Sequence, residues 1–342
     1  MDKLGYHFSF GPWNLHEGAD PFGPPVRPAV AFDKKLETYK RLGYDFVQFH
    51  DDDAVPNLDD KSPSEIEREA IALKRKLDSM GLRGEFVAPR LWENPNTIDG
   101  AYTANDPVAR QYAHDRSLKA LDIAAALEID LIVLWLAREG TYMREAKDAV
   151  RAVDLLVDSV NRMLVHNPSV RIAIEPKPNE PMDLAYVPTI GHAMALGYKT
   201  TDPTRVGVLV ESAHAILAGL DPADEMAFGL AYDKLWSVHL NDQNGLKYDQ
   251  DRSFGAVNLR RAFDQVLVLD EARYYDKGVV GMDVKAVRTQ KPPAEQHLAN
   301  SLETFLRLVH KVRTLDRAAL QACRDARDYE ALDRLIMAHL LG

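Results

Sequence analysis

Eight short runs of apolar and β-branched residues recur along the chain, and a segment with helical character follows each of them. Alternating strands and helices favour parallel strands joined by helical crossovers, and eight such units are the number that closes a barrel. We therefore predict an α/β fold of the (β/α)8 or TIM barrel type over residues 1–293. The predicted strands span residues 6–10, 46–50, 84–88, 131–135, 171–175, 206–211, 235–239 and 279–283.

Residues 294–342 have helical character throughout, over 302–312 and again over 318–341, with no further strand pattern. A barrel of eight units has no place for an additional segment. We predict a C-terminal helical extension that packs on a neighbouring subunit, and therefore a homo-oligomer. The alternative is that this segment covers the base of its own barrel.

The composition describes a soluble globular protein. A chain of 342 residues that is 46% hydrophobic can bury a large core. No apolar run reaches the roughly 20 residues of a membrane span, and the N-terminus lacks the pattern of a signal peptide, so we expect a cytoplasmic protein without a membrane partner. The formal net charge of −10 argues against a nucleic-acid partner. The single cysteine, Cys323, excludes an internal disulfide framework.

The string IEPKPNEP at residues 174–181 places charged side chains between prolines directly after an apolar run. Proline fixes φ and has no N–H to donate, so the strand must stop there and hold Glu175 at its carboxyl end. Parallel α/β proteins place their chemistry at that end of the strands. The alternative is a proline-rich strand exit with solvated charges.

Acidic and histidine side chains also follow four other predicted strands. So many carboxylates cannot share one end of a barrel unless cations neutralise them, which predicts bound metal. The prevalence of oxygen ligands points to Mg²⁺ or Mn²⁺, the histidines leave room for Co²⁺ or Zn²⁺, and Glu211 has the carboxylate to bridge two ions. Taken singly, each group also fits a core histidine, a solvated turn or a polar loop. The groups are His50 with residues 51–53, Glu211 with His214, His239, Asp249 with Asp251, and Asp283 with Lys285.

These residues occur in strings that resemble D-xylose isomerase, particularly its shorter, actinobacterial-type class. The resemblance runs from about residue 10 to residue 285 and implies a homotetramer or dimer of carbohydrate metabolism that interconverts D-xylose and D-xylulose, or related sugars. It also implies two divalent ions per subunit, Mg²⁺, Mn²⁺ or Co²⁺. The matching strings are FGPW (10–13), DPFG (20–23), FHDDD (49–53), YTAND (102–106), REG (138–140), IEPKPNEP (174–181), KYDQD (247–251), and Asp283 with Lys285.

The resemblance also implies roles for individual residues. His50, oriented by Asp53, would promote opening of the sugar ring, and Lys177 would donate to the carbonyl oxygen during a metal-assisted hydride shift. Lys177 has a structural alternative, an ion pair with Glu180 or Asp283. The implied metal ligands are Glu175, Glu211 and Asp283 for one ion, and Glu211, His214, Asp249 and Asp251 for the other. The implied substrate-binding residues are Trp13, Trp92, Trp135, Lys285 and, from a neighbouring subunit, Phe22.

The chain departs from the family pattern at His239, which stands where the family has an aspartate ligand. We expect His239 to be a ligand that weakens Mg²⁺ binding relative to Mn²⁺ or Co²⁺, with Asp242 as a possible source of the missing charge. Arg90 and Trp92 also replace family residues, so the preferred sugar need not be xylose. A sugar epimerase on the same barrel and a non-catalytic sugar- or metal-binding homologue are the alternative functions.

Overall fold

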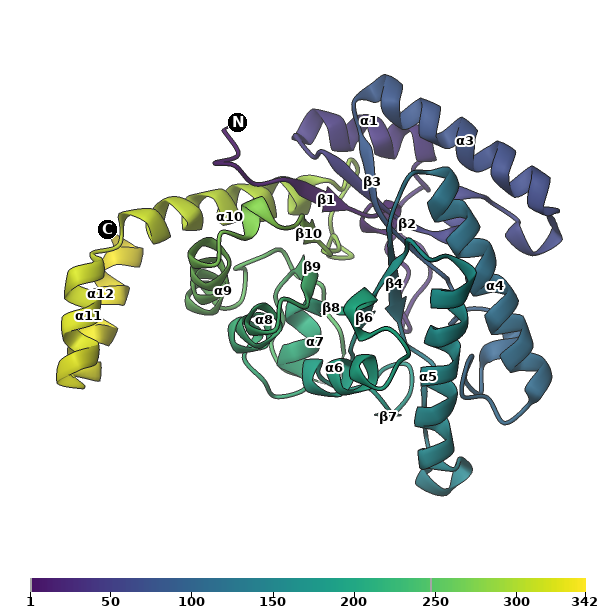
Figure 1. Ribbon diagram of the computed structural model, residues 1–342. Coiled ribbons are helices and arrows are strands. Elements are labelled where there is room, and N and C mark those ends of the chain that lie inside the picture. Colours follow the sequence, from purple (N-terminus) through teal and green to yellow (C-terminus); the bar gives the residue numbers. More distant parts are fainter. Residues whose placement is uncertain (1, 247) are drawn as a thin grey trace.

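The computed structural model describes residues 2–246 and 248–342, and it contains the predicted closed barrel (Figure 1). All neighbouring strands in the barrel are parallel, and β1 closes it by pairing with β10 on one side and β2 on the other. In spatial order the strands are β1 (Phe8–Phe10), β10 (Val280–Met282), β9 (Leu235–Leu240), β8 (Val206–Glu211), β6 (Arg171–Glu175), β4 (Leu131–Trp135), β3 (Arg83–Ala88) and β2 (Phe46–His50).

Eight longer helices surround the strands, each following one of them along the chain. The best-marked prediction concerns α3, where Glu65 accepts a hydrogen bond from the Ser62 backbone N–H (2.9 Å) and Gly81 ends the helix at φ 63°. The helices are α1 (Phe32–Leu42), α3 (Pro63–Met80), α4 (Pro107–Ala126), α5 (Ala149–His166), α6 (Ile190–Tyr198), α8 (Pro222–Ala231), α9 (Leu259–Glu271) and α10 (Gln296–Thr314).

Shorter elements lie in the connections between strands and helices. Two of them, α2 (Asp51–Ala54) and α7 (Ser212–Leu217), begin directly after a barrel strand, and β5 (Gly140–Thr141) pairs with β7 (Leu184–Ala185) in a small antiparallel sheet. The 3-10 turns are η1 (Pro12–Asn14), η2 (Leu58–Asp60), η3 (Pro95–Thr97), η4 (Arg144–Ala146), η5 (Pro203–Arg205) and η6 (Tyr274–Asp276).

The core has two parts because barrel strands are buried on both faces. A small cluster fills the interior of the barrel, and a much larger one lies between the strands and the surrounding helices. The interior cluster consists of Phe86, Ala88, Leu131, Val133, Ala173 and Leu209.

The C-terminal helices differ in how they meet the barrel. Helix α10 packs against α9 and β10 and buries Leu302, Phe305 and Val309, so it covers the barrel wall like the other seven surrounding helices. The last two helices, α11 (Arg317–Ala326) and α12 (Tyr329–Leu341), lie at the far end of α10 and pack on each other (Figure 1, yellow). The boundary at residues 293 and 294 and a role at a subunit interface stay predictions.

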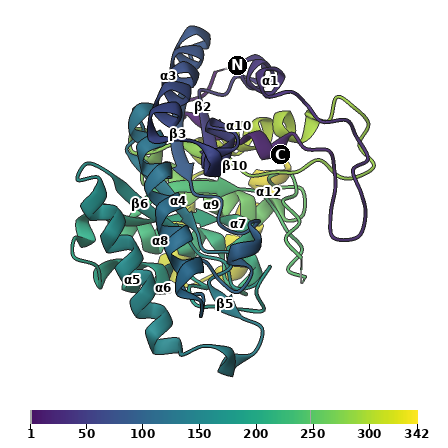
Figure 2. The same ribbon diagram turned by 90° about the vertical axis from the view of Figure 1, so that its right-hand side faces the viewer.

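Two long loops lie side by side at one end of the barrel (Figure 2). The loop that follows β1 carries Arg27, whose Nη1 donates to the carbonyl oxygens of Val287 and Gln290 (both 3.0 Å) in the loop after β10. Arg288 donates in return to the carbonyl oxygen of Gly18 (2.6 Å). Within residues 2–246 and 248–342, no helix has both the length and the apolar character needed to cross a membrane.

Candidate active site

The carboxyl ends of four neighbouring strands bring acidic and imidazole side chains to one end of the barrel. Glu175 is the last residue of β6, and Glu211 is the last residue of β8. His239 lies opposite Glu211 in the register of β9, and Asp283 directly follows β10. Because neighbouring parallel strands end at the same edge, these side chains converge as predicted from the order of the strands.

The prolines on either side of Lys177 explain the exit from β6. They end the ladder after Glu175 and fix the path of the chain, so that Lys177 turns towards the same acidic cluster. Lys177 Nζ lies 2.9 Å from Asp249 Oδ2 and 3.0 Å from Glu180 Oε2. The ion pair with Glu180 is the predicted structural alternative for this lysine, and the contact with Asp249 was not predicted.

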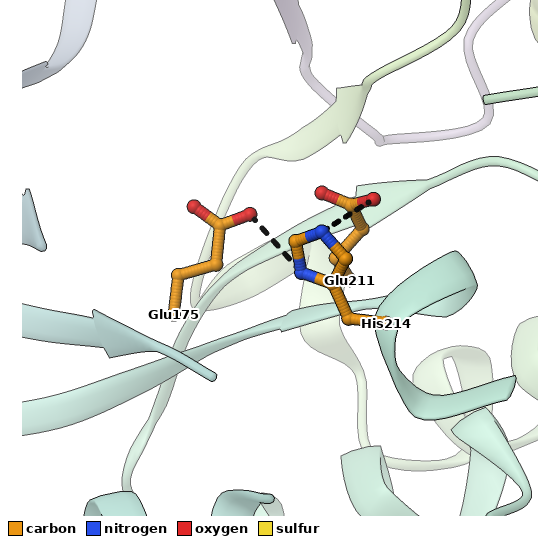
Figure 3. Close-up of side chains that lie close together, drawn as sticks. All are labelled: Glu175, Glu211 and His214. Atoms are coloured by element: carbon orange, nitrogen blue, oxygen red, sulfur yellow. Dashed lines mark ion pairs between the residues drawn. The ribbon is translucent and has the colours of Figure 1, made fainter. Parts of the chain in front are cut away.

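Glu211 lies at the centre of the cluster. Figure 3 shows His214 between Glu175 and Glu211, with Nδ1 3.7 Å from Glu175 Oε1 and Nε2 3.3 Å from Glu211 Oε1. Burial, together with nearby carboxylates, holds the pKa of Glu211 well above its usual range. Ligand atoms within 4.8 Å of one another form three groups that all contain Glu211: with Glu175 and His214, with His239 and Asp283, and with Asp249 and Asp251.

His239 faces three carboxylates. Its Nδ1 lies 3.3 Å from Glu175 Oε1, 3.5 Å from Glu211 Oε2 and 3.8 Å from Asp283 Oδ2. Burial alone would lower the pKa of His239, but these carboxylates raise it well above its usual range. The side chain therefore belongs to the cluster.

The third group of ligand atoms joins Glu211 to Asp249 and Asp251, which lie in the loop after β9. Asn241 Nδ2 donates to Glu211 Oε1 (3.0 Å) and to Asp251 Oδ1 (3.1 Å), and so ties this loop to the strand ends. Lys285 pairs with Asp251. Asn241 was not predicted as a site residue, although its position one residue after β9 was a signal. Lys247, which begins the predicted KYDQD string, lies outside the described residues.

Asp242 does not supply the charge that His239 removes. Its Oδ2 accepts hydrogen bonds from the backbone N–H groups of Val257 (2.7 Å) and Asn258 (2.9 Å), and its Oδ1 accepts one from Gln243 (2.9 Å). The carboxylate is thus committed to the backbone of its own loop.

The cluster suits a divalent cation. Among the described residues, four of its buried atoms have no hydrogen-bond partner, and each is an atom type that ligates metal: His214 Nδ1, both ring nitrogens of His239, and Asp249 Oδ1. Five carboxylates also lie together here, which is costly without a compensating positive charge. Carboxylate oxygens with imidazole nitrogens are a set that Mn²⁺, Co²⁺ and Zn²⁺ accept.

The predicted acid–base pair comes together beside this cluster. His50 ends β2, and Asp53 lies in the short helix that follows it. His50 Nδ1 is 3.0 Å from Asp53 Oδ2, which also accepts a hydrogen bond from the His50 backbone N–H (3.1 Å). Burial opposes ionisation of Asp53, but His50 and Arg90 outweigh it and lower the pKa of Asp53 below its usual value.

Three tryptophans form a continuous surface between the two groups. The ring centroid of Trp13 lies 4.2 Å from that of His50, and Trp92 contacts both His50 (5.0 Å) and Trp135 (4.5 Å). Trp13 Nε1 donates to Asp283 Oδ1 (2.9 Å), and Lys177 Nζ lies 5.2 Å from the centroid of Trp135. The tryptophans therefore connect the predicted acid–base pair to the acidic cluster.

Phe22 lies apart from these tryptophans. Its side chain is 74% exposed at the tip of the loop after β1, where its ring contacts that of Tyr248 (5.2 Å between centroids). The predicted insertion of Phe22 into a neighbouring subunit's site stays a prediction.

Comparison with known proteins identifies the family of this barrel. The family model described as Xylose isomerase-like TIM barrel matches residues 36–308. The chain is 34% identical to the xylose isomerase of Thermus thermophilus over 293 residues, which cover 84% of this chain and 75% of that protein.

Solved structures of low sequence identity share the fold. A D-tagatose 3-epimerase-like protein superimposes with a TM-score of 0.64 at 15% identity, over 89% of this chain and 98% of its own. An IolI protein with a bound zinc atom gives a TM-score of 0.61 at 16% identity, over 90% and 99%. The family model matches most of the chain, and the Thermus thermophilus xylose isomerase is 34% identical to it over 84% of its length. The chain therefore belongs to the Xylose isomerase-like TIM barrel family.

Proposed function

We propose that the protein is a metal-dependent aldose–ketose isomerase that acts on D-xylose or a related aldose. The observation that carries this proposal is the position of Glu211, which lies within reach of three groups of ligands while Lys177 contacts the same cluster. The likeness to the Thermus thermophilus xylose isomerase over most of the chain supports the same reaction class.

In this proposal His50 and Asp53 open the sugar ring. Asp53 holds the backbone of His50 through its N–H (3.1 Å), and a histidine exchanges protons readily near neutral pH. The tryptophans pack on the C–H faces of the open-chain sugar and keep water away from it. Lys177 donates a hydrogen bond to the carbonyl oxygen while hydride moves between adjacent carbons. Bound divalent ions would supply Lewis-acid stabilisation of the negative charge on the sugar oxygens.

The ligands divide between two ions as the family resemblance implies. Glu175, Glu211, His239 and Asp283 would hold the first, and Glu211, His214, Asp249 and Asp251 the second. We propose Mn²⁺ or Co²⁺ ahead of Mg²⁺ at the first position, because an imidazole nitrogen there favours transition metals. The zinc atom named with the IolI structure makes Zn²⁺ a further candidate for that position.

Replacing His239 by aspartate is expected to shift metal preference towards Mg²⁺. The change restores an anionic oxygen ligand and removes the softer nitrogen. We expect the ratio of Mg²⁺ to Co²⁺ affinity to rise about tenfold, the equivalent of about 1.4 kcal/mol. Calorimetric titration of the metal-free proteins measures this ratio without an activity assay. An unchanged ratio would place the side chain outside the coordination sphere.

A sugar epimerase is the second candidate, and one observation favours it. Lys177 and Lys285 already pair with Asp249 and Asp251, so these acids are partly neutralised without a second ion. The remaining ligands then describe a site for a single ion in which carboxylates pass a proton to and from a carbon next to a carbonyl.

Removal and return of metal tests the proposed function. Protein stripped with a chelator is expected to form no ketose from any aldose in a panel of pentoses and hexoses. Addition of Mn²⁺, Co²⁺ or Mg²⁺ is expected to restore ketose formation from at least one of them. Running the assay in deuterium oxide separates the reaction types, because hydride transfer retains the original hydrogen while proton transfer exchanges it with solvent.

Each outcome of this experiment has one interpretation. A ketose without solvent deuterium supports the isomerase. An epimer that carries deuterium at the inverted carbon supports the second candidate. Sugar binding measured by calorimetry at full metal loading, without formation of any product, would support the non-catalytic sugar-binding alternative.

A further inference from the structure

His50 Nδ1 has two neighbours that require opposite states of the ring. Asp53 Oδ2 lies 3.0 Å away and can only accept a hydrogen, whereas Arg90 Nη2 lies 2.7 Å away and can only donate one. A neutral imidazole carries its single hydrogen on one of its two nitrogens. Nδ1 can therefore satisfy Asp53 or Arg90, and the choice determines what Nε2 offers to a ligand.

The contacts favour Arg90 as the partner of Nδ1. Its distance is the shorter of the two, and a guanidinium is always protonated, so it cannot take the accepting role. Asp53 does not need the imidazole hydrogen. Its Oδ2 accepts from the His50 backbone N–H (3.1 Å), and its Oδ1 lies 3.4 Å from Arg90 Nη2.

The guanidinium of Arg90 is held in place before any ligand binds. Arg90 Nε donates to Asp52 Oδ1 (2.8 Å), and the backbone N–H of Arg90 donates to Asp51 Oδ1 (3.1 Å). Arg116 fixes both acids in turn, through Asp51 Oδ2 (2.8 Å) and Asp52 Oδ2 (3.1 Å). Two arginines thus clamp the acidic triplet of residues 51–53, and this clamp aims Arg90 Nη2 at the histidine.

We propose that Arg90 is a positioning residue that fixes His50 in the tautomer with its hydrogen on Nε2. The ring then presents a hydrogen-bond donor, and not a lone pair, beside Trp13 and Trp92. This consequence for a sugar rests on the proposed function, whereas the tautomer itself does not. In the sequence interpretation, Arg90 lies at a position where the chain departs from the family pattern.

Nitrogen NMR of protein with isotope-labelled histidine tests the assignment directly. Neutral imidazole nitrogens with and without hydrogen resonate in well-separated regions, and a His50→Gln variant identifies the His50 signals among those of the 11 histidines. For the neutral ring we expect the His50 Nδ1 signal in the region of nitrogens without hydrogen and the Nε2 signal in the region of nitrogens that carry one. In Arg90→Met the two positions are expected to exchange, because Asp53 becomes the only partner of Nδ1.

Glu93→Gln is the matched control. Glu93 contacts the other end of the same guanidinium, 3.3 Å from Arg90 Nη1, and its side chain is largely exposed, so the change should leave the His50 signals in place. A wild-type spectrum with hydrogen on Nδ1 would overturn the proposal even if Arg90→Met did not fold. An unchanged tautomer in folded Arg90→Met would also overturn it. None of these spectra requires turnover, so failure of the isomerase proposal is a separate result.

Discussion

Glu211→Gln is expected to abolish both metal binding and sugar conversion. Glu211 belongs to all three groups of ligands, so its loss removes an anionic ligand from every metal position that the cluster offers. Loss of a residue that only hydrogen-bonds to a metal ligand lowers metal affinity or activity by roughly 10–100-fold. Loss of a ligand itself should cost more, so we expect activity to fall by about 10³-fold or more. Calorimetric metal titration and a ketose assay measure the two effects separately.

The same variant is expected to make the metal-free protein more stable. The pKa of Glu211 is raised, so its ionised form is less favourable in the folded than in the unfolded protein, and stability is lost as pH rises above the ordinary glutamate range. Glutamine removes that cost and keeps an oxygen for Asn241 Nδ2. A higher midpoint of thermal denaturation is therefore expected for the metal-free variant than for metal-free wild type, measured above the ordinary glutamate pKa range.

Glu139→Gln provides a control for metal binding, because burial raises the pKa of Glu139 as it raises that of Glu211. Glu139 is also buried, but its carboxylate accepts hydrogen bonds from the backbone N–H groups of Ala101, Tyr102 and Thr103. Glutamine would leave part of this set unsatisfied, while metal binding should persist because Glu139 lies outside the ligand groups. If Glu211→Gln lowered the stability of the metal-free protein, the cluster would not be a site of unfavourable charge.

The barrel could be predicted because each strand is a local property of the sequence. Strands β2, β4, β6 and β8 begin and end at the predicted residues, and charged residues mark both ends of β2, β6 and β8. Strands β1 and β10 are shorter than the predicted runs of residues 6–10 and 279–283, so Asp283 lies just outside its strand. Helix α10 follows the last strand and covers the barrel wall, which a count of strands alone did not indicate.

The candidate site could be predicted only as far as strand ends determine it. Glu175, Glu211 and His239 converge because parallel strands end at one edge. The partners of these residues could not be predicted, because they depend on how loops fold back in space. Arg90 reaches His50 across 40 residues of sequence, and Lys177 reaches Asp249 across 72. Contacts between residues so far apart in the sequence leave no local pattern from which they could be predicted.

Lys177→Met is expected to lower kcat by about 10²–10³-fold, the usual cost of removing a donor that stabilises developing negative charge. Methionine keeps the length and apolar character of the stem, so packing near Trp135 should persist. If Lys177 addresses the carbonyl oxygen, KM should change much less than kcat. Steady-state kinetics of ketose formation at saturating metal measure both parameters.

The alternative role of Lys177 predicts a different response. If the lysine serves only to neutralise Asp249 and Glu180, its loss makes that corner more negative, so divalent metal should bind more tightly and restore activity at saturation. Lys147→Met is the matched control, because Lys147 is equally buried but donates to the carbonyl oxygen of Asp99, away from the cluster. A kcat defect in Lys177→Met that excess metal leaves unchanged, with near-normal kcat in Lys147→Met, would assign the lysine to the reacting carbonyl.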